Sequence, residues 1–159
     1  MKRNKRIHTL LVAVSWWLVA APALAQDGNE AKLLNLASTG ETAAALELIG
    51  RNTDVNQSQS DGTTALHWAV YYDDEALVRQ LIRRGAEVTA RNEFGATPLA
   101  QAAIIGNPDI IDRLLDAGAD ANEEGADGQS PLMVVARSGN MEAAKILVDA
   151  DADVNVIEK

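Results

Sequence analysis

Histidine is the first residue type to weigh for catalysis, because its ordinary pKa suits acid–base chemistry near neutral pH. The chain has two histidines, His8 and His67, and no cysteine. His8 lies in an N-terminal segment that we expect to be removed, which leaves one imidazole and excludes a histidine cluster or a thiol nucleophile. His67 could in principle act with a serine and an aspartate, but its place in a repeated motif gives a sufficient structural account. We therefore expect no enzyme activity and no cofactor.

Acidic residues raise the question of metal binding. Asp149, Asp151 and Asp153 alternate along the chain, as the first ligands of a calcium-binding loop do. Such a loop would next need a glycine where Val154 stands, and a bidentate glutamate further along. Elsewhere no spacing brings two carboxylates into a predicted pocket of low dielectric constant. We predict no metal site.

Residues 1–25 are typical of a cleavable signal peptide. Four basic residues precede an apolar run over residues 7–21, and Pro22 then leads to a small-residue cleavage site at Ala23-Leu24-Ala25. The alternative is a membrane anchor, but about 15 apolar residues are fewer than the roughly 20 that span a bilayer. We therefore predict a periplasmic or secreted protein with no stable membrane insertion after cleavage.

Charge narrows the class of partner. The formal net charge of the chain is −9, and residues 1–25 hold four of the 14 basic residues and none of the 23 acidic ones. The mature chain would therefore carry 10 basic residues and a net charge of −13. An acidic surface disfavours nucleic acid and anionic lipid, and it favours a partner with a basic surface. We expect a monomer with one domain at residues 26–159.

One stretch recurs every 33 residues. DGTTALHWA at 61–69 aligns with FGATPLAQA at 94–102 and with DGQSPLMVV at 127–135, so that glycine, a hydroxyl residue and leucine coincide. The stretch resembles the ankyrin repeat, whose T-P-L-H-x-A signature and 33-residue period are both present. Only His67 keeps the signature histidine. The resemblance implies that this imidazole hydrogen-bonds the backbone of a neighbouring loop.

The period divides the domain into four units: 28–60, 61–93, 94–126 and 127–159. The resemblance implies an all-α ankyrin-repeat solenoid of four helix-turn-helix units with hairpin-like loops. Unit 28–60 lacks the proline and histidine of the signature, and we interpret it as an N-terminal cap.

The helix boundaries follow from capping residues. Thr64, Thr97 and Ser130 are predicted to cap the first helices, with proline next in the last two units. Asp74, Asn107 and Asn140 are predicted to cap the second helices. Gly85 and Gly118 are predicted to end the second helices in a left-handed conformation, and Asp151 and Asn52 take that place in the outer units. Apolar residues at i, i+1, i+4 and i+5 predict the buried stripe of each second helix.

The informative residues are those that the fold does not demand. In ankyrin-like proteins the loop tips and the exposed sides of the first helices form a concave binding face, and Tyr71, Tyr72, Phe94, Ile104 and Ile105 would form an apolar cluster there. The alternative is that the isoleucines turn into the core and the tyrosines are ordinary amphipathic cover. Trp68 is expected to lie buried between units. The predicted contact residues are Asp61, Thr63, Tyr71, Tyr72, Arg91, Glu93, Phe94, Ile104, Ile105, Asp127, Gln129 and Arg137.

Two functions remain open at this point. The first is a non-catalytic protein–protein interaction module that acts in the cell envelope. The second is an inhibitor or immunity protein that blocks a toxin or a hydrolase, which would need slow release and a Kd near or below roughly nanomolar.

Overall fold

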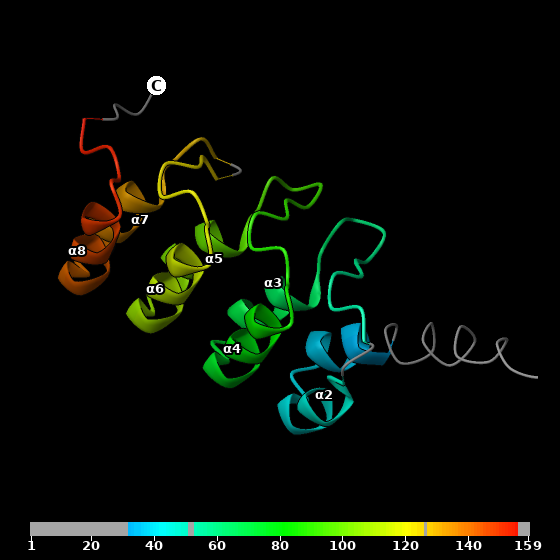
Figure 1. Cartoon of the computed structure of the whole chain (residues 1–159). Coiled ribbons are helices and arrows are strands. Elements are labelled where there is room, and N and C mark those ends of the chain that lie inside the picture. Colours follow the sequence, from blue (N-terminus) through cyan, green and yellow to red (C-terminus); the bar gives the residue numbers. More distant parts are fainter. Residues whose placement is uncertain (1–31, 51–52, 126, 156–159) are drawn as a thin grey trace, which may run out of the picture.

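The computed structural model describes residues 32–50, 53–125 and 127–155, and the predicted signal peptide and Asn52 lie outside them. The described residues form helices in consecutive antiparallel pairs, with no strand apart from an isolated bridge between Ser58 and Thr64. The predicted all-α solenoid is confirmed (Figure 1). The helices are 32–38, α2 (Thr42–Leu48), α3 (Ala65–Tyr71), α4 (Glu75–Arg83), α5 (Pro98–Ile105), α6 (Pro108–Asp116), α7 (Pro131–Ser138) and α8 (Met141–Asp149).

In the last three repeats, the first helix begins at a residue whose side-chain hydroxyl accepts a hydrogen bond from an otherwise unpaired helical N–H. The side chains of Thr64, Thr97 and Ser130 each accept a hydrogen bond from the backbone N–H three residues later. Pro98 and Pro131 occupy the first helical position, where a fixed φ is favourable and no N–H is needed. These predicted starts are confirmed.

The second helices also begin as predicted. Asp74 and Asn140 accept from the backbone N–H of the third residue that follows, and Asn107 caps α6 in the same way. Beyond the C-terminal ends of α4 and α8, the chain turns through left-handed residues, with φ +84° at Gly85 and +63° at Asp151. Such conformations disfavour most side chains, and aspartate is among the more tolerant types.

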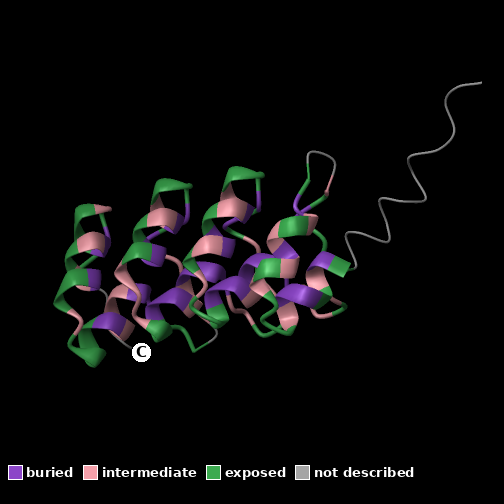
Figure 2. Cartoon of the chain, turned by 90° about the horizontal axis from the view of Figure 1, so that it is seen from below, coloured by how far each residue is buried: buried purple, intermediate pink, exposed green. Residues whose placement is uncertain are grey.

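The helices stack in two rows. The first helices α3, α5 and α7 pack side by side, and the second helices α2, α4, α6 and α8 form the other row (Figure 1). Leu81, Leu114 and Leu147 recur at the 33-residue interval and are fully buried. Buried segments run along the inside of the stack, and exposed residues gather at the helix ends and loops (Figure 2). In α8 the equivalent stripe is less covered, and Val148 is 45% exposed.

An asparagine side chain makes the same pair of hydrogen bonds across two of the three junctions. At the first junction, Asn56 Nδ2 donates to Gly85 O at 3.0 Å, and its Oδ1 accepts from the Glu87 amide at 2.8 Å. At the third junction, between units 94–126 and 127–159, Asn122 makes the same pair of bonds with Asp151 and Asp153. At the second junction, between units 61–93 and 94–126, the equivalent residue is Thr89. A threonine lacks the amide that makes both bonds.

Replacing Thr89 with asparagine should therefore supply the bridge that the second junction lacks. We expect the Thr89→Asn variant to unfold with a free energy higher by about 1 kcal/mol, because each net hydrogen bond contributes roughly this amount. Urea denaturation followed by circular dichroism measures the change. The matched Asn122→Thr variant should lose a similar amount, and equal stability of all three proteins would contradict the account.

Candidate functional site

The exposed sides of α3, α5 and α7, together with the adjoining loop tips, form one surface, which we call the inner face. Tyr71, Ile104 and Arg137 occupy equivalent positions on these three helices and are all exposed. The exposed fractions of Tyr71 and Ile104 are 52% and 72%. The adjacent Ile105 is also exposed, so neither isoleucine is taken into the core between units. The inner face therefore carries apolar side chains in contact with solvent.

An aromatic cluster occupies the N-terminal half of the inner face. The Tyr71 ring meets the Trp68 and Tyr72 rings edge to face, with centroids 5.8 Å and 5.1 Å away, and Trp68 stacks on Tyr72 at 6.4 Å. The Tyr72 hydroxyl donates to Ser38 O at 3.0 Å and so attaches the cluster to the preceding unit. Trp68 is half-buried against the core rather than enclosed between units as predicted.

The loop tips are held in a row by hydrogen bonds between units. Arg91 Nη1 donates to Gly95 O at 2.6 Å within its own loop and to Glu124 O at 2.9 Å in the next. The Glu93 amide donates to Asp61 O at 2.8 Å in the preceding loop. Phe94 stands at this row with 68% of its surface exposed. The predicted contact residues Arg91, Glu93 and Phe94 are thus presented by an ordered backbone.

One predicted contact residue is wrong. Thr63 is 7% exposed, because Asn92 of the next loop covers it and donates from Nδ2 to its hydroxyl at 3.2 Å. Asp61 is half-buried, and its carboxylate accepts from the Thr63 amide at 2.9 Å, which lowers the pKa of Asp61. Asp127 remains exposed and Gln129 is half-buried.

His67 uses one ring nitrogen within its own unit and the other across the second junction. The Thr64 amide donates to Nδ1 at 3.2 Å, and the Thr64 hydroxyl lies 2.9 Å from the same atom. Because Nδ1 accepts, Nε2 carries the proton and donates to Ala96 O at 3.1 Å in the next unit. Burial lowers the pKa of His67. A neutral imidazole enclosed in this way connects two units.

In the third repeat, Ala100 stands in place of the histidine, and a different hydrogen bond satisfies the capping hydroxyl. The Thr97 hydroxyl donates to the Glu123 carboxylate, which enters from the following loop. Glu123 replaces Ala90 at this register, so the loop supplies the acceptor that the helix no longer carries. Burial raises the pKa of Glu123.

A hollow of about 210 Å³ opens on the inner face between α5 and α7. The predicted contact residues Ile104, Asp127 and Gln129 line it, together with six others. The sequence reasoning did not foresee the hollow, and the signal that could have indicated it is the small size of Ala100 and Gly125. The remaining lining residues are Ala96, Ala100, Gln101, Gly125, Pro131 and Val134.

A sequence model of ankyrin repeats in three copies matches residues 10–92 and 70–158, which together cover most of the chain. The chain belongs to the ankyrin repeat family. Ankyrin repeats generally act as protein–protein interaction modules and typically have no catalytic activity. No curated protein matches the chain.

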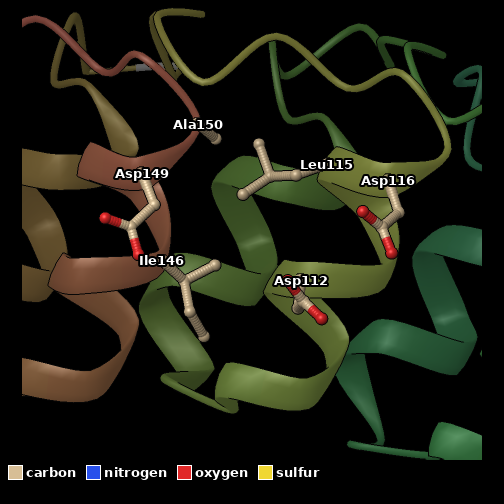
Figure 3. Close-up of a pocket in the computed structure, with 6 residues that line it drawn as sticks. All are labelled: Asp112, Leu115, Asp116, Ile146, Asp149 and Ala150. Atoms are coloured by element: carbon tan, nitrogen blue, oxygen red, sulfur yellow. The ribbon is translucent and has the colours of Figure 1, made fainter.

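The outer side of the ankyrin stack holds a second hollow, of about 300 Å³, between α6 and α8 (Figure 3). Leu115, Ile146 and Ala150 supply its apolar part, while Asp112, Asp116 and Asp149 supply carboxylates. The Asp149 carboxylate already forms an ion pair with Lys145.

Neither a metal cluster nor a membrane span is found in the part of the ankyrin chain that the structure describes. There, no three histidine or acidic side chains converge as metal ligands would. None of the helices in that part combines the length and the hydrophobicity needed to cross a bilayer.

The enclosed imidazole of His67 should make the stability of the ankyrin stack depend on pH. Its folded pKa lies below the ordinary value of 6.5, so above pH 6.5 the side chain is neutral in both states and the stability is complete. Below this pH the unfolded chain takes up the proton first, and the free energy of unfolding should fall. Urea denaturation between about pH 7 and pH 5.5 measures the slope. His67→Gln should abolish this component, and equal slopes in both proteins would contradict it.

Proposed function

We propose that this ankyrin protein is a non-catalytic binding module that is exported to the cell envelope and binds a partner protein through its inner face. The observation that carries the proposal is the apolar surface of Tyr71, Phe94 and Ile104, each more than half exposed. Contiguous apolar patches on a soluble protein are typical of contact surfaces, and tyrosine is enriched among the residues that dominate binding energy.

The rigidity of the inner face supports this role. Tyr71 and Tyr72 belong to a cluster of three rings, and Arg91 connects two loop tips through backbone carbonyls. A partner would therefore meet side chains that are already ordered, which reduces the entropy lost on binding. We expect the backbone of the inner face to move little when the partner binds.

Charge supports a partner with a basic surface. The net charge of the whole chain is −9. Glu93 and Asp127 are exposed beside the apolar residues of the inner face, although Arg137 also lies there. Such a rim would increase the rate at which a basic partner arrives, and it disfavours nucleic acid. We propose that the module is monomeric before it binds.

A non-catalytic role is consistent with the state of the one histidine outside the proposed signal peptide. Both ring nitrogens of His67 are engaged with Thr64 and Ala96, and burial keeps its pKa low. A general base needs a nitrogen that can reach a substrate. His67 instead connects two ankyrin units.

Removing apolar surface from the inner face should weaken partner binding without unfolding the stack. We expect Tyr71→Ala/Phe94→Ala to recover at least tenfold less partner than the wild type in a tagged pull-down from the native envelope, followed by mass spectrometry. Both residues are exposed, so the melting temperature should change by only a few degrees. Tyr72 is left intact because its hydroxyl bonds to Ser38.

The matched control is Met141→Ala/Val148→Ala, which removes two exposed apolar side chains of α8 that lie off the inner face. Recovery of the same partner should be unchanged in this control. If the two double variants lose the partner equally, or neither loses it, the inner face is not the binding surface.

Export is the second testable part of the proposal, and it rests on residues 1–25, which lie outside the described residues. We expect the protein isolated from the cell envelope to begin at Gln26, because cleavage follows Ala25. N-terminal sequencing and intact mass would show this. Retention of residues 1–25 in the isolated protein would contradict it, and Ala25→Arg should block processing.

A further inference from the structure

The hollow between α5 and α7 has an unusual origin within this chain. It lies at the third junction, between α5 and α7. The equivalent helices one repeat earlier are α3 and α5, at the second junction. Each residue that lines the hollow therefore has an equivalent 33 positions before it. The two junctions differ in the size of the side chains at these equivalent positions.

At the second junction, larger or polar side chains stand at the equivalent positions. Asn92 Nδ2 donates to the Thr63 hydroxyl at 3.2 Å, and His67 donates to Ala96 O at 3.1 Å. The Trp68 ring contacts the rings of Tyr71 and Tyr72. At the third junction the residues equivalent to Thr63, His67, Trp68 and Asn92 are Ala96, Ala100, Gln101 and Gly125. Four substitutions by smaller or more flexible side chains thus coincide at one place.

One backbone hydrogen bond of the loop is the same at both junctions. The Gly125 amide donates to Gln129 O at 2.9 Å, just as the Asn92 amide donates to Ala96 O at 3.1 Å. Gly125 does not have a left-handed φ, and a Cβ built on it would lie 3.7 Å from Ala100 Cβ. The glycine is therefore not needed for the turn. Its visible effect is to leave the hollow open.

The lining of the hollow is mostly apolar, and the nearby Thr97 hydroxyl already has a partner. The Thr97 hydroxyl donates to Glu123, which does not line the hollow. Ala96, Ala100, Pro131 and Val134 supply an apolar lining, and Ile104 adds an exposed apolar side chain. At about 210 Å³ the hollow is smaller than the roughly 300 Å³ at which small-molecule sites begin. Its size suits one amino-acid side chain.

The negative charge of Asp127 favours a cationic residue of the partner next to that side chain. Asp127 is exposed and belongs to the lining, whereas the nearby Arg91 is held by the carbonyls of Gly95 and Glu124. In the surroundings of a chain with net charge −9, a cation beside the apolar group would be stabilised at Asp127. The Gln101 amide also lines the hollow, and an amide group suits the backbone of an extended segment.

We infer that this hollow is an anchor pocket, which takes one aliphatic or aromatic side chain of an extended segment of the partner protein, with a neighbouring lysine or arginine paired to Asp127. The inference rests on the proposed function, because it names the chemistry by which the inner face recognises its partner. The aromatic cluster around Tyr71 adds contact area, and the pocket adds selectivity.

The experiment uses a phage library of random dodecapeptides, selected on the purified full chain. We expect the selected peptides to share an apolar residue next to lysine or arginine. Synthetic peptides carrying that sequence are then titrated by fluorescence anisotropy. Ala100→His/Gly125→Asn, which installs the residues that close the second junction, should raise their Kd at least tenfold. Its melting temperature should be equal to or above that of the wild type, which separates a closed pocket from a damaged fold.

Charge reversal tests the other half of the pocket. Asp127→Lys should raise the Kd at least tenfold, while Asp112→Lys, an equal change of charge on the outer side, should leave it within twofold. An apolar-only consensus together with insensitivity to Asp127→Lys would overturn the pairing with Asp127. A library that yields no binder would overturn the anchor pocket.

The two double variants also distinguish failure of the anchor pocket from failure of the inner-face proposal. If the selected peptides are weakened by Tyr71→Ala/Phe94→Ala but not by Ala100→His/Gly125→Asn, the inner face binds protein segments and the anchor pocket is wrong. If both double variants bind the peptides as the wild type does, the anchor pocket and the inner-face proposal both fail for such segments.

Discussion

No helix pair of this chain can bury its own apolar stripe, and every other feature depends on that constraint. Leu114 in α6 is fully enclosed only because α4 and α8 pack on its two sides. The stability of one repeat is therefore inseparable from that of its neighbours. Because the buried faces must meet in the same register at every junction, the first helices are brought into one row. The inner face is a consequence of that row.

Hydrogen bonds between units set the register that apolar contacts alone would leave loose. Asn56 and Asn122 bridge loops about 30 residues apart, and His67 bonds the following unit through Ala96 O. These bonds do not repeat identically. Thr89 interrupts the series of asparagines, and His67 is the one imidazole at its register position, so each junction has its own chemistry. A repeat protein thereby gains a distinct site without changing its backbone.

Local signals made the fold predictable, whereas the site depends on residues that are distant in sequence. The caps Thr97 and Asn107 and the left-handed Asp151 act within a few residues, so their roles could be read directly. The burial of Thr63 could not be predicted in this way, because it depends on the side-chain amide of Asn92 from another loop. The hollow was missed for the same reason: alignment reveals small residues one by one, and only the stacked backbone shows that Ala100 and Gly125 adjoin one space.

The bridges between units span only about 29 to 34 residues, as those from Asn56, Arg91 and Asn140 do. Under tension applied at the two ends, such helix pairs are loaded in series, like the coils of a spring. Each junction then carries the whole force, and the weakest yields first while the others hold. Such a protein would lengthen in steps of one repeat and recoil when released.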